Sequence, residues 1–273
     1  MIQNLQILFQ NYPQKAIAAF NVYGYEDASA VLTAAETLGQ PVILMVNRDA
    51  AGYMPLHLIG PLLHEMGERA SVPVCVHLDH ALSLNAIRIA CCNQFTSVMI
   101  DGSQLPFEEN VSLTRQVIAL AHPLGISVEA EIGSVGYDEP SHTVKGVLTE
   151  PEEAKRFFGE ARVDCLAVSV GTVHRQTQQT AVIQYERLSA IMKAVDVPIV
   201  IHGSSSVPDE DLTRLSRAGV RKINLGTCLR MAFGCTLRET VLQTSDFDRI
   251  RLFRPSIEAT TQSAMNKMRL LTA

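Results

Sequence analysis

The sequence lacks the features that mark several specialised classes of protein. No run of about 18 consecutive apolar residues occurs, so we expect no membrane span and no membrane partner. The N-terminus carries neither a basic leader nor a signal-type apolar run. Positive charge is not in excess either, because 23 basic and 28 acidic side chains give a net charge of −5. This balance argues against a nucleic-acid partner held by overall basicity, but leaves room for a small positive pocket.

Cysteine is scarce and shows no spacing typical of a metal or redox site. The chain has six cysteines, none of them in a CxxC pattern, and Cys75 and Cys165 lie inside apolar runs. Buried, reduced thiols of this kind are typical of cytosolic proteins. We therefore expect a cytoplasmic protein that needs no disulfide to fold.

The length and composition indicate one large globular unit. A chain of 273 residues with 47% hydrophobic and 19% charged residues is not intrinsically disordered. It is long enough to bury a large core without disulfides or metal. No linker, repeat or low-complexity stretch divides it, so we expect a single domain over residues 1–273.

Two kinds of segment alternate along the chain. Short apolar segments, which suit strands buried on both faces of a parallel sheet, occur at 16–21, 42–46, 74–78, 97–100, 127–131, 165–169, 199–201 and 222–225. Segments with helical spacing occur at 27–38, 56–69, 83–92, 107–121, 150–158, 185–193 and 209–218. Eight such units in about 250 residues are typical of the α/β class and predict a (β/α)₈ TIM barrel.

The competing fold is an open, doubly wound α/β sheet. That fold usually carries a glycine-rich turn after its first strand. Here the first strand is followed by AFNVYGYED (19–27), which lacks the GxGxxG pattern. The barrel is therefore the favoured fold, and its active site is expected at the C-terminal ends of the strands.

Three histidines stand at that end of the predicted barrel: His80, His174 and His202 follow the third, sixth and seventh strands. A catalytic zinc takes three protein ligands, and neutral imidazole is the commonest of them. Glu131 or Glu129, at the end of the fifth strand, could orient a ligand or replace one. The sixth strand has no lysine, so we expect carbon–carbon chemistry here to use a metal rather than an imine.

The last two strands lead into short loops that suit an anion. The seventh is followed by HGSSS (202–206) and the eighth contributes NLGT (224–227). Barrels often bind phosphate on backbone N–H groups after these two strands. We therefore predict a phosphate site between the two loops.

Taken together, the motifs resemble those of the class II, zinc-dependent ketose-bisphosphate aldolases. They are HLDH (77–80), IDGS (100–103), ENVSLTR (109–115), VEAEIG (128–133), LAVSVGTVH (166–174), IHGSSSVP (201–208) and KINLGTCLR (222–230). The match runs in order from Ala19 to about Phe233. It is most similar to the tagatose-bisphosphate aldolase branch, whose eighth-strand motif has a small residue, here Gly226, where fructose enzymes commonly have Asp.

The resemblance implies a role for each matching residue. Asp79 would exchange the proton of the hydroxyl that becomes the aldehyde oxygen. His80, His174 and His202 would bind Zn²⁺, and Glu131 matches the carboxylate beside the metal. The residues implied to line the pocket or hold the phosphate end of a dihydroxyacetone-phosphate moiety are Asn21, Gly203, Ser204, Ser205, Asn224, Gly226 and Thr227.

A second acid–base group is needed at the other carbon of the broken bond. In the family a mobile loop supplies it, and the matching loop here, 133–146, contains Asp138 and Glu139. Either could transfer that proton. The resemblance also implies a homodimer or homotetramer, and leaves open whether a monovalent cation, Na⁺ or K⁺, assists phosphate binding as in relatives.

Two segments depart from the family pattern. Arg175 follows the second zinc histidine, where the family usually has Gly beside the phosphate, and it could instead contact phosphate or carboxylate directly. The segment NRDA (47–50) is also unusual. Either change could select another phosphorylated sugar or a sugar acid.

Two other functions compete with the zinc aldolase that cleaves a ketose 1-phosphate or 1,6-bisphosphate. A zinc hydrolase on the same barrel usually has an HxH pair after the first strand, where AFNVYG (19–24) stands. A non-catalytic paralogue that binds a sugar phosphate is compatible with Arg175, but Asp79 and the three histidines favour catalysis.

Overall fold

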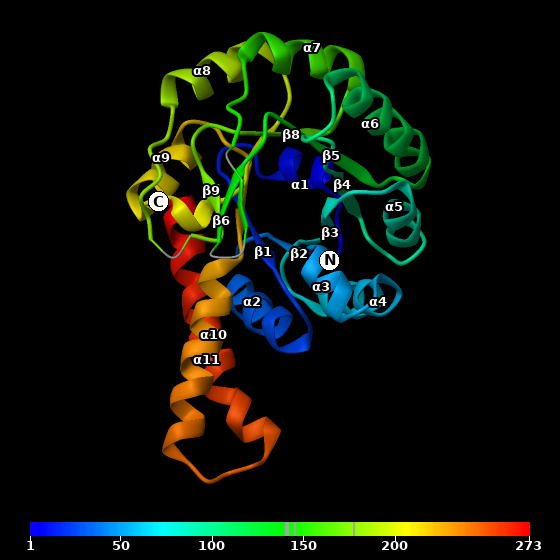
Figure 1. Ribbon diagram of the computed structural model, residues 1–273. Helices are drawn as coiled ribbons and strands as arrows, with labels where there is room; N and C mark the ends of the chain where they lie inside the picture. The colour runs from blue at the N-terminus through cyan, green and yellow to red at the C-terminus, as the bar shows by residue number, and fades with distance from the viewer. Residues whose placement is uncertain (140–141, 145, 177) are drawn as a thin grey trace.

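The computed structural model describes residues 1–139, 142–144, 146–176 and 178–273, and its centre is a closed parallel β-barrel (Figure 1). The strands follow one another around the barrel in the order β1-β11-β10-β8-β5-β4-β3-β2. Their bounds are β1 Ile17–Asn21, β2 Val42–Val46, β3 Val74–Ala81, β4 Ser97–Ile100, β5 Ser127–Ile132, β8 Cys165–Val168, β10 Ile199–Ile201 and β11 Lys222–Leu225. The predicted TIM barrel is confirmed, and every predicted strand is present.

Helices cover the outside of the barrel, one layer deep, as the helical spacing of the sequence predicts (Figure 1). Acidic residues in the first turn and glycine after the last turn help to define several of them, as in α2, which ends at Gly39 with φ of 62°. The helices packed between the strands are α2 Tyr25–Leu38, α4 Leu56–Arg69, α5 Leu84–Cys91, α6 Phe107–Ala121, α7 Pro151–Ala161, α8 Tyr185–Ala194 and α9 Asp209–Arg217.

Several elements were not expected from the sequence. Two short helices precede or follow strands, α1 (Leu5–Asn11) and α3 (Arg48–Tyr53). A small second sheet lies above the barrel, formed by β6 (Gly136–Glu139), β7 (His142–Val144) and β9 (Val173–His174). Short 3₁₀ turns occupy His122–Leu124 and Ser204–Ser206. These pieces are too short to give a clear hydrophobic period.

Apolar side chains form two cores, one outside and one inside the barrel. The outer core lies between the strands and the helix layer and contains Phe20, Leu63 and Phe157. The inner core is closed at the N-terminal end of the strands by α1, whose Leu5, Leu8 and Phe9 pack against inward-facing barrel residues. The helix α1 therefore seals one end of the barrel, and the other end carries the site. Cys75 and Cys165 are buried free thiols of the inner core, as expected.

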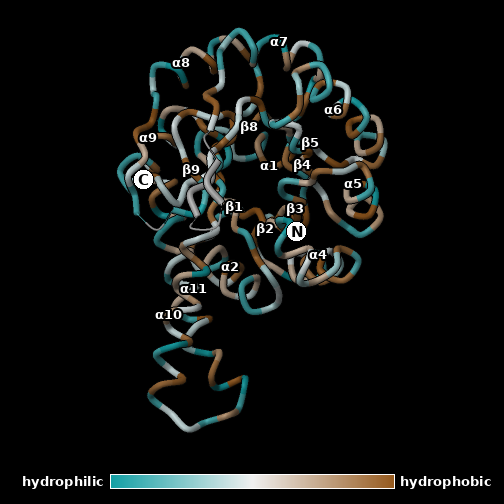
Figure 2. The backbone as a smooth tube through the Cα atoms, viewed as in Figure 1, coloured by the Kyte–Doolittle hydropathy of each residue, from teal (hydrophilic) through white to brown (hydrophobic). Residues whose placement is uncertain are grey.

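The C-terminal part of the chain forms a helical hairpin that projects beyond the barrel (Figure 1). It consists of α10 (Thr227–Gln243) and α11 (Arg249–Thr272). The end of α11 returns to the barrel, where Met268 and Leu271 are buried, but the tip stands away from it. Parts of the tip are hydrophobic in sequence (brown in Figure 2). The exposed apolar residues of this segment are Val241, Leu242, Phe247 and Ile250. None of the helices within the described residues is long and apolar enough to cross a membrane.

The seal at the closed end of the barrel predicts a stability effect that is separate from the site. Leu8→Ala should lower the free energy of unfolding by about 2–5 kcal/mol, because it leaves a cavity in the inner core. Ile7→Ala on the same helix, where the side chain is 44% exposed, should change it by less than about 0.5 kcal/mol. Urea unfolding measures both, and equal effects of the two variants would contradict this assignment of α1.

Candidate active site

The C-terminal ends of the barrel strands bring His80, His174 and His202 together, although they lie far apart in sequence. The ring centroid of His80 is 5.3 Å from that of His174 and 4.6 Å from that of His202. One nitrogen of each ring lies within 4.8 Å of the others, so the three can hold one metal ion. The sequence-predicted ligands therefore share one site.

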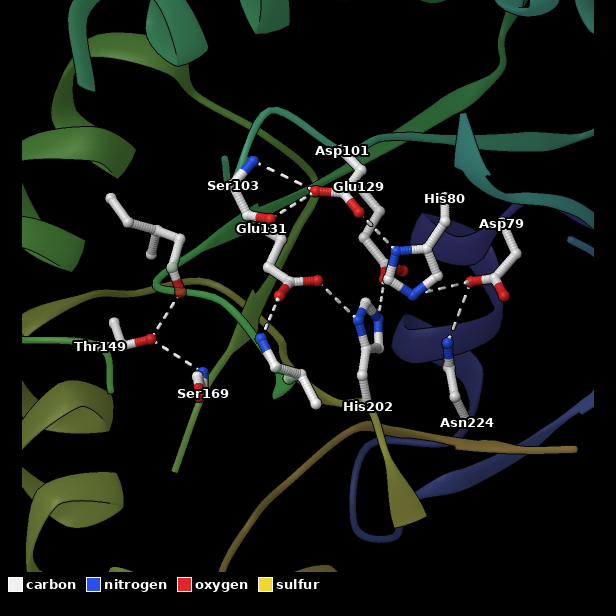
Figure 3. Close-up of polar contacts among 12 residues, drawn as sticks. Asp79, His80, Asp101, Ser103, Glu129, Glu131, Thr149, Ser169, His202 and Asn224 are labelled. Carbon is white, nitrogen blue, oxygen red and sulfur yellow. Dashed lines mark hydrogen bonds and ion pairs between the residues drawn. The ribbon is translucent and has the colours of Figure 1, made fainter. Parts of the chain in front are cut away.

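A distortion of β3 directs His80 into this site. The register between β3 and β4 shifts between Leu78 and Ala81, as at a β-bulge, and His80 has φ of 51°. Bulges often re-aim a side chain beside an active site. Nδ1 of His80 lies 2.8 Å from a carboxylate oxygen of Asp101, while its Nε2 is buried without a hydrogen-bond partner (Figure 3). A histidine held in this way at Nδ1 offers Nε2 to a metal.

His202 belongs to a buried ionic cluster, and Figure 3 shows its contacts with two glutamates. Its Nε2 is 2.9 Å from Glu129 and its Nδ1 is 2.9 Å from Glu131, and Lys222 donates to Glu129 at 2.8 Å. Burial disfavours the charged ring, but the hydrogen bonds to the two carboxylates outweigh it and raise the pKa of His202 to about 10. Glu129 and Lys222 are both fully buried and keep each other ionised.

His174 has the opposite electrostatic environment. It comes from the short strand β9, and burial together with the neighbouring His80 and His202 holds its pKa well below the usual value. A neutral imidazole is the form that binds metal. Asp101 and Glu131 also lie within 4.8 Å of His80 and form a second group of candidate ligands. Glu131 is thus placed either to orient His202 or to bind the ion.

Asp79 is a further buried carboxylate beside the histidine cluster, and unlike Glu129 and Glu131 it lines the pocket. Its Oδ1 is 4.0 Å from Nε2 of His80 and accepts a hydrogen bond from Asn224 at 3.1 Å. Nearby cations, above all His80, overcome the effect of burial and lower the pKa of Asp79. The side-chain oxygens of Asn21 and Asn224 are buried without partners. These are polar atoms that a hydroxylated ligand can satisfy.

The loop after β10, where the sequence predicts a phosphate site, packs closely against the backbone of β9. Gly203 has φ of 67°, and a Cβ there would lie 2.9 Å from the carbonyl carbon of Val173. Only glycine fits this position without displacing its neighbours. The hydroxyl of Ser204 donates to the carbonyl of Asn224, so it joins the two loops. Beside them, α10 begins at Thr227 and directs its N-terminal N–H groups toward this end.

Most of the predicted site residues line a single pocket above the histidines. Those that do are Asn21, Asp79, His80, His174, Arg175, Gly203, Ser204, Ser205, Asn224, Gly226 and Thr227. His202 and Glu131 do not line the pocket, but both are buried next to His80, which does. Asp138 and Glu139 belong to β6, but their side chains lie outside the described residues.

The pocket also contains residues that sequence reasoning missed. Arg230 lines it, three residues after Thr227 and thus one helical turn along α10. This three-residue spacing from Thr227 on one helix is the sequence signal from which a place for Arg230 in the site could have been predicted. Tyr23, Asn47, Arg48 and Asp49 form the wall next to β1 and β2. Asn47, Arg48 and Asp49 belong to the segment 47–50, whose departure from the family pattern did suggest a role in substrate choice, so among these wall residues only Tyr23 was missed.

The ionic cluster beneath His202 predicts that Lys222 matters for stability. Lys222→Met should lower the free energy of unfolding by roughly 3–5 kcal/mol, because it leaves Glu129 as an under-compensated buried charge. Adding Glu129→Gln should recover part of the loss, since the two residues interact directly. Lys193→Met, at an exposed helical position, is the matched control and should have little effect in chemical denaturation. A loss in Lys222→Met no larger than in the control would show that the pair is not needed.

Comparison with known proteins identifies the family. The family described as class II fructose-bisphosphate aldolase matches residues 8–273. A fructose-bisphosphate aldolase from Geobacillus stearothermophilus is 35% identical over 261 residues, which are 93% of this chain and 90% of that protein.

Two solved structures of aldolases have the same fold as this chain. The YdjI aldolase of Escherichia coli K12 has a TM-score of 0.87 at 30% identity, covering 99% of this chain and 97% of that one. A fructose-bisphosphate aldolase from Campylobacter jejuni shares the fold, with a TM-score of 0.84 at 22% identity, covering 99% of this chain and 95% of that one. The chain therefore belongs to the class II fructose-bisphosphate aldolase family and is a metal-dependent aldolase, a carbon–carbon lyase.

Proposed function

We propose that the protein is a zinc-dependent aldolase that reversibly cleaves a ketose 1-phosphate or 1,6-bisphosphate into dihydroxyacetone phosphate and an aldehyde. The observation that carries the proposal is the cluster of His80, His174 and His202 directly below a pocket that also holds Asp79 and the glycine-serine loop at Gly203. The name of the relative from G. stearothermophilus, a fructose-bisphosphate aldolase, supports a ketose bisphosphate as substrate.

The side chains fit a zinc ion at this place. His80 offers a buried ring nitrogen that has no hydrogen-bond partner, and His174 is held in its neutral form. A metal at His202 would take the place of one carboxylate contact and release the proton that the ring now shares with Glu129 and Glu131. Zinc bound by these three histidines would polarise the ketose carbonyl and stabilise the negative charge that cleavage leaves.

We assign to Asp79 the transfer of the proton on the hydroxyl group whose oxygen becomes the aldehyde oxygen. Asp79 is almost fully buried, it is ionised, and the amide of Asn224 holds one of its oxygens, so that it faces the pocket as a base. The unpartnered amide oxygens of Asn21 and Asn224 are placed to accept hydrogen bonds from sugar hydroxyls. A positioned acid–base group of this kind raises the rate of the chemical step by a factor of about 10²–10⁴.

The phosphate end of the sugar is assigned to the loops after β10 and β11. Gly203 and Ser205 on one side, and Gly226 and Thr227 on the other, line the pocket there. A Cβ at Gly226 would meet only Asn21, at 3.5 Å. The lack of a carboxylate at this position favours a tagatose-type ketose over a fructose-type one.

A carboxylate of the β6–β7 hairpin is assigned the second proton, at the carbon that keeps the negative charge. β6 pairs in parallel with β9, and Tyr137 lies opposite His174 in the register. Asp138 and Glu139 therefore follow directly along the strand that borders a metal ligand. This placement supports one of the two as the acid–base group.

The exposed tip of the α10–α11 hairpin supports a homodimer. Phe247 is 92% exposed, Leu242 is 81% exposed and Ile250 is 74% exposed. An apolar patch of this kind is typical of an interface, and a second copy of the chain is the proposed partner.

All six cysteines are free thiols in the structure, which supports the cytoplasm as the compartment.

Asp79→Asn tests the assignment of catalysis. In zinc-loaded protein, with tagatose and fructose 1,6-bisphosphates as substrates and a coupled triose-phosphate readout, kcat should fall by about 10²–10⁴. The zinc content should stay at that of the unaltered protein, because Asp79 is not a proposed ligand. Asp101→Asn is the contrasting variant, and it should weaken zinc affinity by about 10–100-fold through His80. Full turnover in Asp79→Asn would refute the role of Asp79.

Phe247→Asp tests the dimer. A charge at the exposed tip should move the mass measured by light scattering from two chains to one, without changing the circular dichroism spectrum. Glu210→Lys, at an exposed position of α9, serves as the charge-change control. A monomeric unaltered protein, or a Phe247→Asp variant that still forms dimers, would rule out this interface.

A further inference from the structure

Lys222, the first residue of β11, is a charged side chain that lies fully buried inside the barrel. Its Nζ donates to Oε2 of Glu129 at 2.8 Å, and both side chains are inaccessible to water. Replacing such a buried ion pair as a whole by apolar residues is often neutral or stabilising. Stability alone therefore does not explain a charged pair in this place, and the contacts around the pair indicate a further role.

Glu129 connects this lysine to the histidine cluster. While Oε2 accepts a hydrogen bond from Lys222, Oε1 lies 2.9 Å from Nε2 of His202, whose side chain is also fully buried. An ionised carboxylate has no hydrogen to donate, so the hydrogen in the contact with His202 belongs to Nε2. Lys222, Glu129 and His202 thus form a chain of hydrogen bonds that crosses from β11 through β5 to the end of β10.

The other ring nitrogen of His202, Nδ1, lies on the side where the metal ligands gather. It is 2.9 Å from Oε2 of Glu131 (Figure 3). Glu131 offers an oxygen within 4.8 Å of ligand atoms of His80 and Asp101, whereas Glu129 belongs to neither group of candidate ligands in the described part of the chain. A histidine that binds metal with one nitrogen usually donates its other N–H to a carboxylate. Glu129 is therefore the carboxylate that keeps its contact, and Glu131 is the one that an ion displaces.

We infer that Lys222 is a positioning residue for the metal site, which acts through Glu129 to turn Nδ1 of His202 toward the ion. The inference rests on the proposed zinc site and specifies how the barrel interior prepares it. The lysine only donates, both oxygens of Glu129 only accept, and Nε2 of His202 is left to donate. This direction of the hydrogen bonds leaves Nδ1 without a hydrogen and open to a metal.

Glu129→Gln tests this direction with almost no change in shape. Because Lys222 can only donate, it should hold the amide oxygen, so that the amide NH₂ group points to His202. Nε2 must then accept, and the ring hydrogen moves to Nδ1, where it blocks the metal. Zinc affinity, measured by competition with a chelating dye, should fall by about 10–100-fold.

Adding Lys222→Met to Glu129→Gln should reverse part of this loss, which a pair with a merely structural role would not do. Without the lysine, the amide can turn its oxygen to His202 and restore donation from Nε2. The double variant, with its fold checked by circular dichroism, should bind zinc about tenfold more tightly than Glu129→Gln alone. Equal or weaker zinc binding in the folded double variant would overturn the inference.

Cys75→Ala is the matched control for disturbance of the inner core. The thiol of Cys75 lies in that core against the hydroxyl of Thr96. Its removal should leave the zinc affinity within about twofold of that of the unaltered protein. A loss as large as that in Glu129→Gln would show that any disturbance of the core weakens zinc binding, and would overturn the role of Lys222.

The identity of the nitrogen that binds zinc separates this direction of hydrogen bonds from a simple effect of charge, and it needs no variant. In a crystal structure of the zinc-loaded protein, Nδ1 of His202 should lie about 2.0–2.1 Å from zinc, with Nε2 still hydrogen-bonded to Glu129. Zinc on Nε2, with the contact to Glu129 broken, would overturn the inference and leave the aldolase function intact. The predicted zinc affinities in a protein that cleaves no ketose phosphate would refute the proposed function alone.

Discussion

The site depends on the buried contacts that the carboxylate of Glu129 makes with Lys222 and His202. This carboxylate lies fully buried inside the barrel, where it accepts a hydrogen bond from Lys222 and contacts His202. A charge in such a place must be paired, and its partners come from different strands. Glu129 therefore ties β5 to β10 and β11 directly beneath the histidine cluster. The position of His202 follows from this buried network and not from the pocket above it.

Around that network the fold places several residues in strained or restricted backbone positions. His80 is left-handed at a bulge, Gly203 is left-handed at the phosphate loop, and Arg175 is left-handed beside β9. Each lies at the rim of one pocket. A barrel sealed by α1 at its other end can support this strain, because most of its apolar core is distant from the rim.

Much of this arrangement could be predicted from the sequence, for a physical reason. The strands are continuous apolar runs, and the residues after them must share one end of a parallel barrel. His80, His174 and His202 could therefore be grouped before any coordinates. The contact of Asp101 with His80 could not, since it depends on the register shift in β3, and bulges leave no clear hydrophobic pattern.

Other features depend on contacts between distant segments. The pairing of β6 with β9 is only two residues long in its register and joins loops that carry no strand-like period. The ion pair of Arg175 with Asp49 spans 126 residues. The sequence signals here were departures from the family pattern, at Arg175 and at 47–50, and the structure brings both to one wall of the pocket.

The most direct test of the account is a crystal structure of the zinc-loaded protein with anomalous diffraction measured at the zinc edge. The account predicts one strong peak within bonding distance, about 2.0–2.1 Å, of a ring nitrogen of each of His80, His174 and His202. That result would place the metal directly below the pocket of Asp79 and Asn224. A peak elsewhere, or a peak bound by fewer than two of these histidines, would contradict the central claim.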